Sequence, residues 1–202
     1  MSKVKTKKHS VWIDMTAMSD VTVLLLTFFM LTSTFIPKEP VQVITPQSVS
    51  EIKIPEANIL TVLVTPKGQI FLNLDRPSDK REVLELIGKD YGITFTNNQI
   101  ASFINQTTIG VPVASLPKFL DLSMDEQDDV LKTGGIPIDS TNNQFKRWVE
   151  HARDVNENLT IAVKADQETP YPLVRQVMST LQDIKENRFN LVTNLKGMPE
   201  GF

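Results

Sequence analysis

Asp20 is the residue whose type and position most directly suggest chemistry. It precedes an apolar run, V-T-V-L-L-L-T-F-F-M-L-T-S-T-F-I, which extends from Val21 to Ile36 without a charged residue. A membrane-spanning helix needs about 20 residues, and a span of that length ending at Ile36 begins at Ala17. Such a span contains Asp20. Acidic side chains inside a span are costly, usually face a helix-bundle interior or a wet cavity, and usually serve a function.

The chemistry expected of Asp20 is proton transfer. A low-dielectric environment disfavours the charged form of a carboxyl group, so the group would accept a proton from one side of a membrane and release it to the other. A proton crossing a membrane releases about 2.3 kcal/mol per 100 mV. One acid on one helix needs partner helices to shield it, which predicts a subunit of a larger complex. The proton is then the transported ion, and no cofactor is expected.

The helix face that carries Asp20 also carries hydroxyl groups. Thr27 and Thr34 recur on this side at helical spacing and would form a supporting polar face. Two simpler interpretations stay open. Ser19 and Asp20 would make a good N-cap for the apolar helix, and the threonines would bond back to their own backbone.

The charge distribution predicts the orientation of this helix. Four lysines and two aspartates give residues 1–36 a net charge of +2, which leaves −5 for the rest of a chain whose total is −3. Because lysines before a span favour the cytoplasmic side, we expect a single-pass inner-membrane protein with its N-terminus in the cytoplasm. A cleaved signal peptide is the alternative, but Asp20 and the lack of an A-x-A-like site disfavour it.

Four segments follow from this pattern. We expect a basic cytoplasmic tail over residues 1–10, a transmembrane helix over 11–36, an extended linker over 37–57 and a periplasmic α+β domain over 58–202. The V-Q-V-I-T stretch of the linker would either pair with a partner peptide or stay unpaired.

Patterns within residues 58–202 predict a small mixed sheet with helices on one face. A region of about 91–143 reads as an insertion of short helices, with a capping box at Ser123 and Glu126. The other expected elements are strands at 59–64 and 69–74 around a T-P-K-G turn, a helix from Ser78 to Gly92, a helix at 145–152, a strand at 159–163, a helix capped by Thr169 and a strand at 189–195.

Composition and motifs exclude several functions. The 202 residues are 41% hydrophobic and include no cysteine, so disulfides, thiolate metal sites and thiol nucleophiles are absent. No basic patch with interleaved aromatic residues suggests nucleic acid. The P-loop, H-E-x-x-H and G-x-S-x-G motifs are missing, so no enzyme and no metal site is predicted. His151 is expected on the exposed side of its helix.

The N-terminal pattern resembles the signature of the ExbD/TolR family. The stretch D-M-T-A-M-S-D from Asp14 to Asp20, followed by the apolar helix, is similar to the family's membrane segment. The resemblance implies that Asp20 is the proton-carrying aspartate, that Asp14 is the acid preceding it, and that Thr27 is a recurrent small polar position. Ala17 replaces the proline usual in the family.

The C-terminal third carries a second part of the same resemblance. L-T-I-A-V-K-A-D, T-P-Y-P-L-V-R-Q-V-M-S-T-L-Q-D-I and F-N-L-V-T-N-L are similar to the family's closing strand, helix and strand. Residues from about 91 to 143 have no recognised counterpart in its short members. The chain looks closer to ExbD than to TolR.

The resemblance also implies partners. Two copies would place their helices inside a pentamer of an ExbB-like or TolQ-like membrane protein, and the complex would energise TonB-dependent outer-membrane transport or TolA. The alternative is a TolR-like or anchor protein for envelope integrity that binds peptidoglycan and has no proton role.

Overall fold

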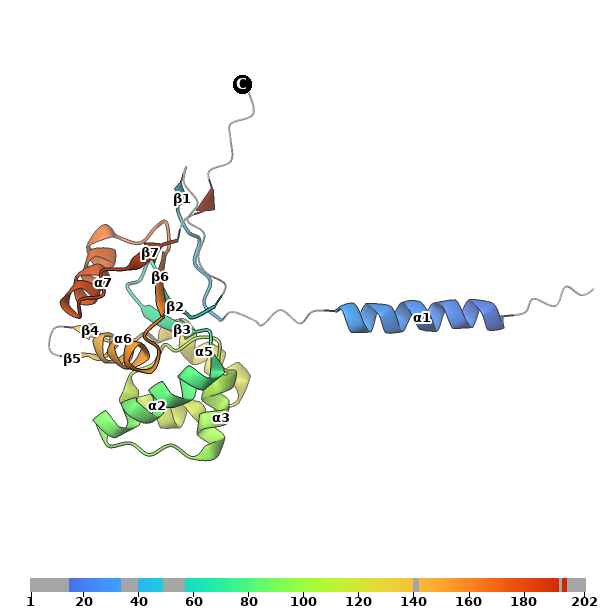
Figure 1. Ribbon diagram of the computed structural model, residues 1–202, viewed down its shortest axis with the longest axis horizontal. Coiled ribbons are helices and arrows are strands. Elements are labelled where there is room, and N and C mark those ends of the chain that lie inside the picture. The colour runs from blue at the N-terminus through green and yellow to red at the C-terminus, as the bar shows by residue number, and fades with distance from the viewer. Residues whose placement is uncertain (1–14, 34–39, 49–56, 140–141, 193, 196–202) are drawn as a thin grey trace, which may run out of the picture. The chain divides into compact units, whose positions relative to one another are not determined.

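The computed structural model describes residues 15–33, 40–48, 57–139, 142–192 and 194–195. The chain divides into two units, Met1–Pro37 and Lys38–Phe202. Helix α1 (Thr16–Thr32) belongs to the first unit. The remaining described elements belong to the second unit, in which a sheet is packed against helices (Figure 1).

The second unit contains a four-stranded mixed sheet in the order β3-β2-β6-β7. Strand β2 runs antiparallel to β3 and parallel to β6, and β7 runs parallel to β6. The strands are β2 (Ile59–Val64), β3 (Ile70–Leu74), β6 (Thr160–Ala165) and β7 (Phe189–Leu191). In the predicted turn between β2 and β3, the amide of Gly68 donates to the carbonyl of Thr65 over 2.9 Å. Gly68 has a φ of 80°, a conformation that glycine adopts without strain.

One face of this sheet is fully apolar. Strand side chains alternate between faces, and the register places Leu60, Val62 and Val64 beside Ile161, Val163 and Ala165, all of them buried. The opposite face is more polar, with half-buried side chains at Thr61, Asn73, Thr160 and Lys164.

Three helices cover the apolar face and lie to one side of the sheet (Figure 1). They are α2 (Pro77–Tyr91), α6 (Gln144–Val155) and α7 (Tyr171–Asp183). Helix α6 buries Phe145, Trp148, Val149 and Ala152, whose spacing forms one helical face. The predicted mixed α+β architecture is therefore confirmed.

The segment of about 91–143 is packed into the same core. Ile109 and Leu72 exchange two backbone hydrogen bonds of 2.7 and 2.8 Å at the outer edge of β3, and Phe103 stacks on Trp148 with ring centroids 5.9 Å apart. The segment forms α3 (Asn97–Asn105), the short helix η1 (Val113–Ser115), α4 (Leu116–Leu120), α5 (Met124–Thr133), β4 (Ile138–Asp139) and β5 (Asn142–Asn143).

The chain before the sheet contacts the domain that follows it. The amide of Ile44 donates to Asp166 Oδ2, and the amide of Gln167 donates to the carbonyl of Ile44, both over 2.8 Å. Strand β1 (Gln47–Ser48) pairs in parallel with β8 (Asn194–Leu195). The strand expected at 189–195 is thus divided: β7 ends at Leu191, and Asn194–Leu195 belongs to a second sheet.

Local capping predictions had mixed outcomes. The capping box of Ser123 and Glu126 and the left-handed Gly92 at the end of α2 are confirmed. Ser78 is not the N-cap of α2, because the helix already begins at Pro77 and the Ser78 hydroxyl donates to Asp79. Thr169 is not the N-cap of α7 either, since its hydroxyl donates to the carbonyl of Val64.

Candidate functional site

Asp20 lies inside helix α1 rather than at its cap. The helix begins at Thr16, and the amide of Ser19 already donates to the carbonyl of Met15 over 2.9 Å. The N-cap interpretation of Asp20 is therefore wrong. The carboxyl group is exposed on the surface of the isolated helix, about one turn after its start.

Among the described residues, helix α1 covers Thr16–Thr32 of the expected span of 11–36. It ends at Thr32, where Ser33 adopts an extended conformation, because the Thr-Ser-Thr stretch has weak helix propensity. Residues 11–14 and 34–36 lie outside the described residues, and so do two predicted site residues, Asp14 and Thr34. Of the helices that the structure describes, none combines the length and apolarity needed to cross a membrane.

The surface of α1 is apolar on every side. All of its residues are exposed, and large side chains on different sides of the helix, such as Met18, Leu24, Leu26 and Met30, are 60–74% exposed. A helix that is apolar all round normally buries its surface in protein or lipid. On this surface Asp20 is the one acidic or basic side chain among the described residues of α1, and a carboxyl group needs a polar partner wherever the helix is buried.

The threonines of α1 bond to their own helix. Thr22 donates to the carbonyl of Met18 over 2.8 Å, Thr27 to Leu24 over 2.9 Å and Thr32 to Phe28 over 2.8 Å. These bonds confirm the simpler interpretation of the threonines, in which their hydroxyl groups bond to the backbone of their own helix. Each hydroxyl keeps its acceptor capacity, so Thr27, about 10 Å along the axis from Asp20 on the same face, still has an oxygen that can accept a further hydrogen bond.

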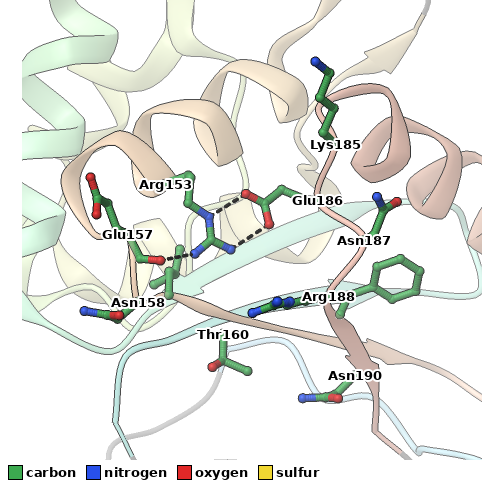
Figure 2. Close-up of a pocket in the computed structure, with 11 residues that line it drawn as sticks. Arg153, Glu157, Asn158, Thr160, Lys185, Glu186, Asn187, Arg188 and Asn190 are labelled. Carbon is green, nitrogen blue, oxygen red and sulfur yellow. Dashed lines mark hydrogen bonds and ion pairs between the residues drawn. The ribbon is translucent and has the colours of Figure 1, made fainter.

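A second candidate site is a polar groove in the second unit, and the sequence did not predict it. It has a volume of about 930 Å³ and lies between the end of α6, the start of β6 and the loop from α7 to β7. Arg153 lies at the edge of the groove and connects two of its walls. It donates to Glu186 Oε2 over 2.7 Å and to the carbonyl of Glu157 over 2.8 Å (Figure 2).

Arg188 is the notable group within this groove. Its side chain extends across the groove towards Thr160 (Figure 2), and none of the described residues pairs with it. A free guanidinium suits a carboxylate or phosphate. The sequence offered no signal for this site, because its walls come from stretches around residues 153–160 and 185–190 that carry no shared motif. Among the described residues, no cluster of acidic and histidine side chains is suited to a metal ion.

His151 does not lie on the exposed side of its helix, where it was expected. Its side chain is only 15% exposed, and its Nε2 lies 2.7 Å from Asp90 Oδ2 on α2. The surface prediction is therefore wrong, because α2 covers that side of α6.

Comparison with known proteins identifies one family. A family model described as biopolymer transport protein ExbD/TolR matches residues 6–196. The matched range includes Asp14, Asp20 and Thr27, the complete four-stranded sheet and the segment of about 91–143. No curated protein and no solved structure matches the chain.

Proposed function

The chain belongs to the ExbD/TolR family of biopolymer transport proteins, and from this premise we propose that it is an inner-membrane proton-motor subunit in which Asp20 carries the proton. The observation that carries the proposal is a single carboxyl group inside a helix that has no other charged residue and exposes apolar side chains on every side. Proteins of this family are accessories to transport, and we assign this chain no enzymatic role.

The proposed topology places the lysine-rich N-terminus in the cytoplasm. Residues from about 38 onward then form the periplasmic part. Family members work with ExbB or TolQ and with TonB or TolA. For this chain we propose an ExbB-like pentamer that encloses the α1 helices of two copies, and a TonB-like protein that receives the energy.

The proposed mechanism depends on a change of charge at one position. When Asp20 binds a proton, the helix loses its one charge among the described residues and can move past apolar surfaces of the partner. When Asp20 releases the proton, the carboxylate again requires a polar or wet environment. Alternation between these two preferences converts proton flow into movement of α1. Thr27 supports the same face by accepting a hydrogen bond from the partner.

A second candidate function is an anchor of the TolR type, which holds peptidoglycan without moving protons. The Arg188 groove favours this alternative, because peptidoglycan stem peptides carry carboxylates that a free guanidinium binds well. Here Asp20 would matter only for helix association.

The decisive experiment is an Asp20→Asn substitution in the native host with the partner membrane protein present. Asparagine has nearly the same shape but cannot bind and release a proton, so proton-motive-force-dependent uptake should fall almost to background. Blotting of the cross-linked complex should show normal assembly. Full uptake by Asp20→Asn would reject the proton role and favour the anchor function.

Two threonines provide matched controls. Thr22 and Thr27 both bond to their own helix, but Thr22 lies on the side opposite Asp20. We expect Thr22→Val to retain full uptake and Thr27→Val to reduce it. Equal effects would argue against a functional polar face.

A further inference from the structure

His151 connects two helices of the second unit through its ring. Nε2 lies 2.7 Å from Asp90 Oδ2 at the end of α2, and Nδ1 lies 3.8 Å from Asp154 Oδ2 on its own helix, α6. Nδ1 is buried and has no hydrogen-bond partner. The ring therefore has a carboxylate opposite each nitrogen, one of them at hydrogen-bonding distance.

The two protonation states of this ring differ in how well they fit these surroundings. In the neutral ring, the hydrogen on Nε2 is donated to Asp90, and the bare lone pair of Nδ1 faces the Asp154 carboxylate without a donor. In the charged ring, both nitrogens carry hydrogens, and each faces a carboxylate. The charged ring thus removes a buried unpaired acceptor and gains a second electrostatic contact.

The other charged groups around the ring do not reverse this preference. Arg147 lies one turn before His151 on α6, but Glu150 pairs with it over 3.3 Å. From α2, the charged side chain within ion-pairing distance of the ring is Asp90. Among the described residues, no cation lies within ion-pairing distance of Asp90 or Asp154 except the ring itself.

We infer that His151 is a pH-sensitive clamp between α2 and α6. Histidine changes charge between about pH 5 and 8, so the clamp tightens on the acidic side of this range and loosens on the alkaline side. The end of α2 near Gly92 should respond most, because Asp90 lies in its last turn. The inference rests on the geometry of the second unit and not on the proposed proton role of Asp20. In the proposed topology, the clamp would face the proton-rich side of the membrane.

Amide hydrogen exchange of the full chain in detergent tests this clamp. After correction for intrinsic exchange rates, amides of α6 and of the end of α2 should be about two- to fivefold more protected at about pH 5.5 than at about pH 8, the range expected for a partly exposed ion pair. In His151→Gln, which keeps an amide donor near Asp90, this pH dependence should disappear.

The chain offers two matched comparisons. His9→Gln removes the other histidine and should leave the pH dependence intact, whereas Asp154→Asn should diminish it because Nδ1 loses its facing carboxylate. The clamp is rejected if the wild-type amides show no pH dependence, or if His151→Gln retains that of the wild type. Either result is independent of the Asp20→Asn outcome.

Discussion

Lys80 shows how a single buried charge is accommodated in this domain. It lies on α2 and is only 7% exposed. Its ammonium group donates to the carbonyl of Ile104 over 3.2 Å and to that of Gln106 over 2.6 Å, at the C-terminal end of α3, where a cation is favoured. Burial lowers the pKa of Lys80, and nearby Asp75 opposes this effect.

We predict that Lys80→Met destabilises the domain by about 1–3 kcal/mol at neutral pH, because two carbonyls lose their donor. A pKa that is lower in the folded state means that the unfolded chain binds the proton more tightly. The free-energy cost of burying the charged ammonium group therefore lowers the stability of the wild type in full at pH values below the folded pKa of Lys80. It is relieved as the pH rises towards the unfolded value of about 10.4.

The stability difference between wild type and Lys80→Met should accordingly grow from neutral pH to about pH 10. Urea unfolding at several pH values measures it, with the exposed Lys89→Met on the same helix as a control that should change little. A difference that shrinks as the pH rises would contradict the burial argument.

Candidate residues could be identified from the sequence where neighbouring residues indicated them. Asp20 was identifiable because one acid adjoins a long apolar run. His151 and Arg188 were not, since the partner of His151 lies 61 residues away and the walls of the Arg188 groove come from separate stretches. Such contacts depend on tertiary packing and leave no local pattern.

At the scale of elements, the turns and helix caps that depend only on nearby residues were predicted correctly, and those that depend on distant residues were not. The T-P-K-G turn, the capping box of α5 and the glycine that ends α2 each depend on bonds within a few residues, and sequence predicted all three. The cap of α7 was missed because the hydroxyl of Thr169 is taken by Val64, 105 residues away. β7 ended early because the chain after it pairs with residues before the sheet.

Gly110 makes the contact between the segment of about 91–143 and the sheet directly testable. A Cβ at this position would lie 2.0 Å from Cδ1 of Phe71 and 3.1 Å from a methyl group of Leu131, and Phe71 is fully buried. Gly110→Ala should therefore cost about 1–3 kcal/mol of unfolding free energy through overpacking.

Gly92→Ala is the matched comparison for this prediction. Gly92 has a φ of 65°, but nothing lies within 4 Å of the added Cβ, so only backbone strain of about 1 kcal/mol is expected. Denaturant unfolding of both variants separates the two effects. A smaller loss of unfolding free energy for Gly110→Ala than for Gly92→Ala would show that Phe71 and Leu131 move aside at little cost.

At the scale of the whole molecule, the sequence suggested that about 91–143 is an addition to a smaller family domain. The structure gives this segment a share of the common core. Buried side chains from it, including Phe103, Val113, Leu116 and Leu131, join the same apolar cluster as the sheet. Its backbone also occupies the outer edge of β3 at Ile109 and Ile136. Periodicity predicted its short helices, but such patterns do not reveal which sheet edge a segment covers.

This arrangement predicts that the segment cannot simply be removed. Replacing residues 93–139 with a short glycine-serine linker would expose the edge of β3, uncover Phe71 and remove the ring stacked on Trp148. An unpaired edge and an exposed apolar patch favour aggregation. We expect the deletion variant to lose its cooperative thermal transition and to elute as aggregate in size-exclusion chromatography, whereas Gly92→Ala in the same preparation stays folded. A deletion variant that unfolds cooperatively near the wild-type temperature would instead show that β2, β3, β6 and β7 with their three covering helices form a self-sufficient core, and that the segment is an accessory layer on it.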